Sequence, residues 1–295
     1  MARAINTANQ ASILVALRER KLVTGEKRSC FIKDNRIFGF KPNHMFDDQS
    51  SNDDVFSIVA KPIVDDALNG INGSILAYGQ TGSGKTYTMF GTSSDPGVVL
   101  LATEHIFKVV NDRRKSYQFV ISMKYIEVYG DTLRDLLDGG KATSFHLGQI
   151  ASTEKTVSDA SALLKLKKDG DVQRTIKATN RNDHSSRSHA ILQIKLESTK
   201  IDANGLEGGK ALVSMLNFVD LAGSEPHDAG KTKDQQAEGN SIRAALCYLS
   251  AMVKSGAVTG NLCKILKESI LGNCKTAFIC TVSPSMIAET RSTIT

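Results

Sequence analysis

The clearest chemical signature in the sequence is the run Gly79–Thr86, which reads GQTGSGKT. It fits the pattern GxxxxGK[ST], in which glycines let backbone N–H groups curl around phosphates and a following helix adds positive potential. In such a loop Lys85 reaches the β- and γ-phosphates, and the Thr86 hydroxyl ligates Mg²⁺. The apolar run Ile75–Tyr78 precedes it, as a strand should. The alternative is a glycine-rich turn without a ligand.

Two segments further along the chain could sense a γ-phosphate. Asp220–Glu225, DLAGSE, follows the apolar run Met215–Val219, where a P-loop protein places the aspartate that helps to hold Mg²⁺. In that arrangement Gly223 offers its backbone N–H to the γ-phosphate. The other segment is Asn182–His189, NDHSSRSH. Taken alone, the first could be a turn at the end of a strand and the second a polar surface loop.

Composition limits the class of protein. The chain has 295 residues and a mass of 31.9 kDa, with 41% hydrophobic and 23% charged residues. These values are typical of a globular protein with a large core and argue against disorder. No run approaches the ~20 apolar residues that cross a bilayer, and the N-terminus shows no secretory signal. Five cysteines without a CxxC pair argue against a zinc site or a disulfide framework and fit a reducing compartment.

The formal net charge is +6, which predicts an acidic partner: DNA, RNA, phospholipid or an acidic protein surface. The charge is unevenly distributed. Residues 47–66 are acidic, whereas residues 240–275 contain one acidic residue, Glu268, and five basic ones, which are Arg243, Lys254, Lys264, Lys267 and Lys275. A solvated helix face is the simpler explanation of this basic stretch.

The elements that must position these residues alternate along the chain, which predicts one three-layer α/β domain without internal repeats or linkers. The expected strands are Ile13–Leu17, Ser74–Ala77, Phe119–Tyr129, His189–Ser198, Leu212–Asp220 and Thr276–Val282. The expected helices are Asn52–Asn69, Lys85–Met89 onward, Val98–Asp112, Ala160–Asp169 and Gly239–Lys254. Pro62 should kink or split the first of these helices, because proline has no N–H to donate.

Together the three motifs, in this order, resemble the kinesin motor domain family. The family's GQTxSGKT loop is followed by a YTM-like stretch, here Tyr87–Met89, and its NxxSSRSH and DLAGSE switches are intact. Weaker matches are Tyr125–Leu137 to YxExYNExxxDLL and Ile279–Pro284 to the last core strand. The resemblance covers nearly the whole chain and implies a kinesin-like P-loop NTPase fold, a central mixed β-sheet flanked by helices. Within the family, the residues over Ala60–Met89 and Thr276–Pro284 lean towards the centromere-associated kinesins.

The resemblance also implies roles for individual residues. Nucleotide contacts fall on Gly79, Gln80, Thr81, Gly82, Ser83, Gly84, Lys85, Thr86, Tyr87, Arg18 and Arg20. Tyr87 would lie against adenine, with the two arginines on the other side of the base. Thr86, Ser186 and, through water, Asp220 would hold Mg²⁺. Ser185 would orient the attacking water, and Arg187 would pair with Glu225 to close the switches over the γ-phosphate. Positioning and electrostatics, rather than a strong base, would carry phosphoryl transfer.

The implied function is an ATP-dependent microtubule motor core that uses ATP/ADP and Mg²⁺ and binds tubulin, with the basic stretch 240–275 covering the tubulin-binding helix and the adjoining loop. It would act in the cytoplasm on the cytoskeleton, including the spindle or kinetochore. No nucleic acid or membrane partner is expected. The rival is a non-motile nucleotide- and tubulin-binding module. Two departures from the family pattern favour the rival, Pro226 in place of Arg and Gly256–Asn261 in place of a PYRDSK-like segment, whereas the three intact nucleotide motifs favour the motor. Two further departures are Lys21 in place of Pro and the sequence IRAAL at Ile242–Leu246 in place of INKSL. A small GTPase is disfavoured, because the chain has no NKxD signature.

The resemblance extends to the end of the chain, where Glu289–Thr295 is similar to the start of the family's last helix. We therefore expect residues 1–295 to be a motor core that stops before the neck linker, with oligomerisation in regions outside this chain. The early first strand suggests a motor at the N-terminus.

Overall fold

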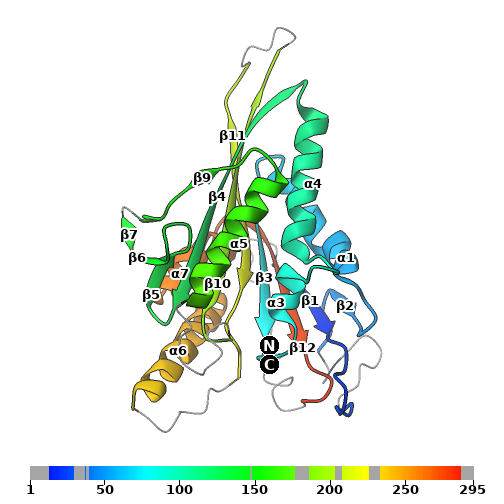
Figure 1. The fold of residues 1–295 in the computed structure, drawn as a ribbon, viewed down its shortest axis with the longest axis vertical. Helices are drawn as coiled ribbons and strands as arrows, with labels where there is room; N and C mark the ends of the chain where they lie inside the picture. The colour runs from blue at the N-terminus through cyan, green and yellow to red at the C-terminus, as the bar shows by residue number, and fades with distance from the viewer. Residues whose placement is uncertain are drawn as a thin grey trace.

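The computed structural model describes residues 13–29, 37, 40–146, 148–176, 186–202, 208–225 and 233–286. In this part of the chain a ten-stranded sheet lies at the centre, with helices on both faces (Figure 1). Its strands are β1 (Ile13–Glu19), β2 (His44–Phe46), β3 (Asn72–Gly79), β4 (Tyr117–Tyr129), β5 (Thr132–Asp135), β6 (Lys141–Thr143), β9 (Lys155–Thr156), β10 (His189–Lys200), β11 (Leu212–Asp220) and β12 (Cys274–Val282). A separate hairpin pairs β7 (Phe145–His146) with β8 (Gln149–Ile150).

The sheet is mixed, as expected. Its main order is β2-β1-β12-β3-β11-β10-β4-β5-β6, and β9 pairs with β4. The first five strands of that order are parallel, whereas β10 runs antiparallel to both β11 and β4. Because the carboxyl ends of parallel strands meet at one edge, the ends of β3, β11 and β12 lie together. That edge is where an α/β protein places its ligand.

Helices cover the two faces unequally. One face carries α1 (Asn52–Val55), a π-helix (Phe56–Ala60), α2 (Lys61–Ala67), α3 (Lys85–Phe90), α4 (Val98–Arg113) and α5 (Ala160–Ile176). The main core lies between these helices and the sheet, and a second core lies under α6 (Lys233–Ser255) and α7 (Gly260–Leu271) on the other face. Long apolar strands buried on both sides hold the site rigidly.

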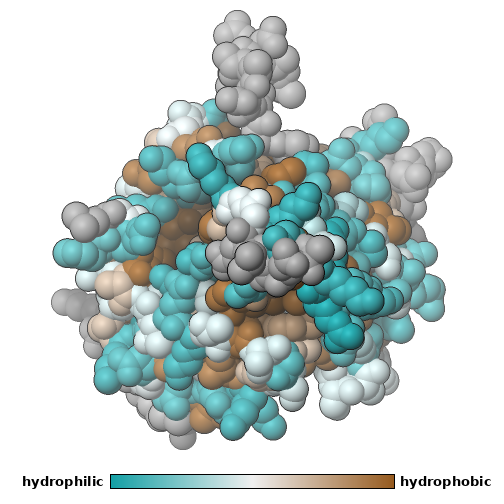
Figure 2. Space-filling view, turned by 90° about the horizontal axis from the view of Figure 1, so that it is seen from above, coloured by the Kyte–Doolittle hydropathy of each residue, from teal (hydrophilic) through white to brown (hydrophobic). Residues whose placement is uncertain are grey.

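The surface is mostly polar. Seen from the end where β11 begins, hydrophilic side chains cover much of the molecule and apolar ones gather in small patches (Figure 2). Exposed apolar residues at this end of the strands include Val120, Leu212 and Val213. Among the described residues, no helix has the length and apolar character that a membrane span needs. Cys247, Cys263, Cys274 and Cys280 are free thiols, and Cys30 lies outside the described residues.

All six expected strands are present, some of them longer than predicted. The expected helix over 52–69 changes its hydrogen bonding beside Pro62: a π-helix ends at Ala60 and α2 begins at Lys61, with right-handed helical backbone on both sides of the junction. Proline has no N–H to donate, so it is tolerated where one hydrogen-bond pattern gives way to the other.

Two predicted helix boundaries are wrong. The expected Ala160–Asp169 continues as α5 through Gly170 to Ile176, because Gly170 lies against Tyr125 instead of ending the helix: a Cβ there would come within 2.5 Å of the Tyr125 ring. The expected Gly239–Lys254 begins at Lys233 instead, since its polar first turns carry no apolar signal. Sequence reasoning also missed α7, although its buried positions Leu262, Leu266 and Ile270 have helical spacing.

Candidate nucleotide site

The loop between β3 and α3 is the centre of the site. Gly79 ends the strand with φ 154° and packs so closely on β12 that a Cβ would lie 2.2 Å from the Thr281 carbonyl oxygen. Gly84 has φ 103°, a left-handed conformation that favours glycine, directly before α3. Ser83 Oγ contacts the Gln80 carbonyl at 2.7 Å and Thr281 Oγ1 at 2.6 Å. The loop therefore packs against β12, and these contacts fix its conformation.

Lys85 places a cation inside this loop. Its ammonium donates to the carbonyl oxygens of Gly79 and Gln80 at 2.8 and 2.9 Å, and the residue is only 7% exposed. These hydrogen bonds hold the ammonium over the backbone that would surround a phosphate. A phosphate oxygen entering the loop would offer Lys85 a stronger, charged acceptor.

Thr86 and Asp220 join two of the three motifs. The Thr86 hydroxyl donates to Asp220 Oδ2 at 2.7 Å. Burial raises the pKa of Asp220 above its usual range, although Arg174, Thr86 and Lys85 oppose the shift. The other oxygen, Oδ1, is buried without a hydrogen-bond partner among the described residues. A hydroxyl beside an unsatisfied carboxylate oxygen suits a hard cation such as Mg²⁺. No described group of three or more His, Cys, Asp or Glu could hold a metal by itself, so the phosphates and water would have to complete its shell.

The Asp220–Glu225 segment contacts both other motifs through its backbone. Gly223 N–H donates to the Ser186 carbonyl at 2.8 Å, and Ser224 N–H donates to the Gly79 carbonyl at 3.0 Å. The Glu225 carboxylate accepts from Thr81 N–H at 2.8 Å. Burial acts to raise the pKa of Glu225, but hydrogen bonds from Thr81 outweigh it and leave the pKa below its usual range. Glu225 is thus an ionised group resting on the phosphate loop.

His189 adds a buried link at the end of Asn182–His189. Its Nδ1 accepts from Ala222 N–H at 3.0 Å. Burial, and then the positive charges of Arg174 and Lys85, lower the pKa of His189 to about 3. The ring is therefore neutral at physiological pH and able to accept this bond. The role of His189 in joining the two motifs depends on a long-range contact that the sequence pattern does not show.

The rest of the Asn182–His189 motif is described only in part. Ser186 and Arg187 belong to the described chain, whereas Ser185 and Pro226 lie outside it. The expected pairing of Arg187 with Glu225 stays a prediction. The Gly223 N–H, expected to reach the γ-phosphate, points instead to the Ser186 carbonyl in this conformation.

A cavity of about 500 Å³ opens beside the phosphate loop, at the expected base end. Its lining includes Arg18, Arg20, Lys21, Ser50, Gly82, Ser83, Gly84, Tyr87, Thr88 and Asp95. The buried Arg18 donates to Asn52 Oδ1 and to Thr88 Oγ1, and its guanidinium lies over the Tyr87 ring, 5.3 Å from the centroid. The Tyr87 hydroxyl bonds to Asp95. These contacts hold an aromatic ring at the cavity wall, where it is available to stack on a base.

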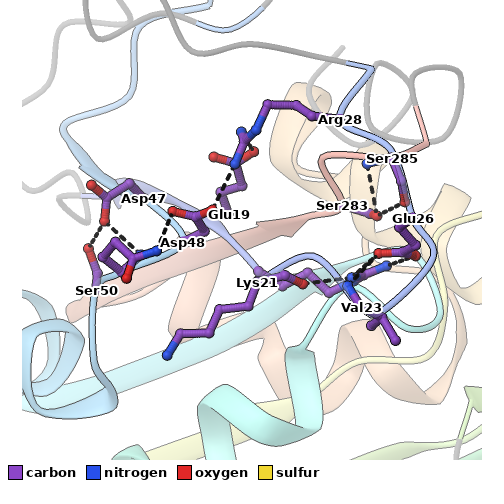
Figure 3. A network of polar contacts seen from close by, with 12 residues as sticks. Glu19, Lys21, Val23, Glu26, Arg28, Asp47, Asp48, Ser50, Ser283 and Ser285 are labelled. Carbon is purple, nitrogen blue, oxygen red and sulfur yellow. Dashed lines mark hydrogen bonds and ion pairs between the residues drawn. The ribbon is translucent and has the colours of Figure 1, made fainter.

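Arg20 lines the same cavity but is held by a partner that sequence reasoning missed. Its guanidinium binds both carboxylate oxygens of Glu26, at 2.5 and 2.7 Å, and also the Lys21 carbonyl. This hydrogen bonding lowers the pKa of Glu26 to about 2. Figure 3 shows the Lys21 side chain extending away from the pair. The pairing depends on a turn at Thr24–Gly25 that brings Glu26 back to β1. The sequence pattern around Arg20 does not predict this pairing.

Known proteins resemble this chain over nearly its whole length. A model of the kinesin motor domain matches residues 4–295. The chain belongs to the kinesin motor domain family. Relatives include the kinesin-like protein KIN-8A of Oryza sativa subsp. japonica (35% identical, covering 84% of this chain and 34% of the relative) and KIN-7N of Arabidopsis thaliana (35%, covering 85% and 33%). Human centromere-associated protein E is 33% identical over 96% of this chain and 12% of its own length.

Solved kinesin structures share the fold. That of a fast kinesin has a TM-score of 0.81 and 26% identity, covering 97% of this chain and 90% of that one. The motor and motor homology domain of Kar3Vik1 gives 0.80 and 27%, covering 96% and 84%. The expected kinesin-like fold is confirmed. The chain spans about a third of the length of the first curated relatives it matches. Kinesin motor domains are microtubule-stimulated ATPases that bind nucleotide, and nothing in the comparisons favours a non-motile module.

In the stretch expected to face tubulin, residues 240–275, one of the five cations is paired within the chain. All five basic side chains of residues 240–275 are exposed, but Lys275 pairs with Asp66 of α2 at 2.7 Å. The remaining four lie on α6 and α7. Gly256–Asn261, which replaces the family's PYRDSK-like segment, comprises the link between these two helices and the first two residues of α7. The side-chain amide of Asn261 donates to the Asp131 carbonyl at 2.6 Å. This segment therefore ties α7 to the turn between β4 and β5.

Proposed function

We propose that this chain is an ATP-dependent microtubule motor core that couples ATP hydrolysis to microtubule binding and movement. The observation that carries the proposal is the convergence of three motifs, far apart in sequence, at one edge of the sheet. Gly79, Ser186 and Gly223 belong to different motifs, yet backbone hydrogen bonds of 2.8–3.0 Å join their segments. A change at the phosphate loop therefore acts on all three at once.

In this proposal ATP or ADP lies along the cavity and the phosphate loop. Tyr87 stacks on adenine, Arg18 holds Tyr87 in place, and Arg20 borders the base. The backbone of residues 79–84 and the ammonium of Lys85 receive the phosphates. Thr86, Ser186 and, through water, Asp220 hold Mg²⁺, which neutralises phosphate charge when bound. The unsatisfied Oδ1 of Asp220 supports this assignment.

Hydrolysis then depends on rearrangement of the two switches. A backbone N–H has one proton, so Gly223 must release the Ser186 carbonyl before it donates to a γ-phosphate. The two segments therefore move together when the nucleotide arrives. Ser185 orients the attacking water, and Arg187 pairs with Glu225 to close the site. Positioned donors and charge, rather than a general base, lower the barrier.

In this proposal a change at the nucleotide site reaches the microtubule through the surface formed by α6 and α7. Leu221 of the Asp220–Glu225 segment packs in one apolar cluster with Ala245 and Leu249 of α6, so a shift of this segment acts on the helix. Four exposed cations, Arg243, Lys254, Lys264 and Lys267, supply attraction to the acidic tubulin surface, which we favour over nucleic acid or membrane. The similarity to centromere-associated protein E supports a place on spindle or kinetochore microtubules.

Steady-state ATPase, measured with and without microtubules at low salt, tests the proposal. We expect strong stimulation that weakens as salt rises, because exposed cations are screened. Lys85→Ala should abolish nucleotide binding, and Glu225→Ala should keep binding but stop turnover. Lys27→Ala, an exposed lysine outside the cavity lining, is the matched control and should behave as the wild type. Nucleotide binding without microtubule stimulation would reject the motor and support the non-motile module.

A further inference from the structure

A buried chain of charges lies outside the residues assigned to nucleotide binding. Glu127 on β4 is fully buried, and Arg174 on α5 is 8% exposed. Arg174 Nε lies 3.4 Å from Glu127 Oε1, and the other carboxylate oxygen, Oε2, lies 3.2 Å from Arg134 Nη1 on β5. The carboxylate is therefore shared between an inner and an outer arginine.

The inner arginine also holds the end of the Asn182–His189 motif. Arg174 Nη2 donates to the Ser188 carbonyl at 3.1 Å and to Ser188 Oγ at 3.0 Å, and Nε donates to the same Oγ at 3.2 Å. Ser188 is fully buried, next to Arg187 and two residues from Ser186. One guanidinium thus fixes both the main chain and the side chain of this residue.

The planar fork of N–H donors on the Arg174 guanidinium explains why an arginine suits this position. Burying a charge pair contributes little stability compared with apolar packing. A guanidinium, however, presents several donors in a fixed plane, so that it sets the direction of a carbonyl as well as its position. Lysine carries the same charge as a single point and does not set that direction.

The position of Ser188 matters because the contacts between the switches lie within two residues of it. The Ser186 carbonyl accepts from Gly223 N–H at 2.8 Å, and His189 accepts from Ala222 N–H at 3.0 Å. An error at Ser188 would misplace both contacts. Lys85 bonds within the phosphate loop, to Gly79 and Gln80, whereas the bonds of Arg174 to Ser188 lie on the switch side. Arg174 acts on Asp220 through its positive charge, so a variant that keeps this charge leaves the electrostatics of the nucleotide site in place.

We propose that Arg174 is a positioning residue for hydrolysis, and that Glu127 acts through it. The guanidinium fork of Arg174 holds Ser188 so that Ser186 and Gly223 meet in register, and the Glu127 carboxylate attracts the fork through an ion-pair contact of 3.4 Å. This inference rests on the ATPase activity proposed above. It assigns a role to residues of β4 and α5 that lie outside the nucleotide-reading motifs.

The decisive variant is Arg174→Lys, which keeps the charge and removes the fork. We expect the microtubule-stimulated kcat to fall on the order of 10- to 100-fold, as for a small misplacement of reacting groups. The dissociation constant for a fluorescent ADP analogue should stay within about twofold of the wild type, because a loss confined to the transition state does not weaken ground-state binding. The urea midpoint should stay near that of the wild type. Arg134→Lys, on the outer side of the same carboxylate, is the matched control and should keep kcat.

Glu127→Gln tests the second half of the proposal and keeps the side-chain shape. It should lower kcat in the same direction, and the double variant with Arg174→Lys should be no slower than Arg174→Lys alone. Additive losses would show that Glu127 does not act through Arg174. A wild-type kcat in Arg174→Lys, or a parallel loss of kcat, ADP affinity and stability, would overturn the proposal. Absence of turnover in the wild type, assayed alongside, would instead reject the ATPase function and this role with it.

Discussion

Acidification should destabilise this protein through His189, the buried histidine that joins the two switches. The ring is 1% exposed and accepts from Ala222 N–H, and burial with nearby positive charge lowers its pKa from 6.5 to about 3. Below pH 6.5 the unfolded chain binds a proton at this site, and the folded chain does not until about pH 3. The stability present above pH 6.5 is therefore lost progressively as the pH falls towards 3.

The size of the effect follows from the two pKa values. The interval between 6.5 and about 3 corresponds to about 5 kcal/mol when it is fully developed. Only part of it is accessible to measurement: from about pH 7.5 to about pH 5 the loss attributable to His189 is about 2 kcal/mol. That is a large share of a typical total stability of about 5–15 kcal/mol.

Urea unfolding of the wild type and of His189→Asn over this pH range measures the loss. The amide oxygen of asparagine can accept from Ala222 N–H but does not titrate, so the variant keeps the hydrogen bond and removes the proton linkage. Carboxylates titrate in both proteins and cancel in the difference. The free-energy difference between the two proteins should shift by about 2 kcal/mol towards the variant at the acid end. Parallel stability curves would refute the reasoning, because His189 would then titrate alike in the folded and unfolded chains.

Two other variants test single contacts. Asp220→Asn can still accept from Thr86 but loses the carboxylate charge, so ADP affinity in excess EDTA should hold while the gain on adding Mg²⁺ shrinks; an unchanged Mg²⁺ dependence would contradict the metal assignment. Gly170→Ala puts a Cβ 2.5 Å from the Tyr125 ring, so urea unfolding should show a loss of about 1–3 kcal/mol although alanine favours helix by about 1 kcal/mol. A more stable Gly170→Ala would show that α5 can move away from Tyr125.

The phosphate loop could be predicted from sequence because its chemistry is local. Eight consecutive residues supply the glycines, the lysine and the hydroxyl, and an apolar strand precedes them. The six longest strands were equally accessible, since a buried strand is a run of apolar residues whatever it packs against, whereas the strands of two to four residues contain no such run and were missed. The helix boundaries were harder. Gly170 suggests an end to α5, but it packs on Tyr125, a neighbour 45 residues away in the chain.

The charge surplus was located less well by sequence. A count of charges over residues 240–275 gives all five cations equal weight. In the structure, however, Lys275 is paired with Asp66, more than 200 residues away in the chain. Four cations remain on the face made by α6 and α7. The same limit applies to Arg20: its family position predicts a base contact, and only the fold shows that Glu26 already holds its guanidinium.

By itself, then, the sequence determined the nucleotide loop, the two switch motifs, the α/β architecture and the kinesin family. Each of these depends on contiguous residues or on the spacing of apolar residues along a segment. Only the tertiary structure decided how the motifs are joined. The Gly223–Ser186 and Ala222–His189 bonds, the Arg174–Ser188 clamp and the buried, unsatisfied oxygen of Asp220 arise where distant segments meet. Hydrogen-bond partners, burial and the resulting pKa values depend on contacts between segments that are distant in the chain, so they cannot be predicted from any one segment.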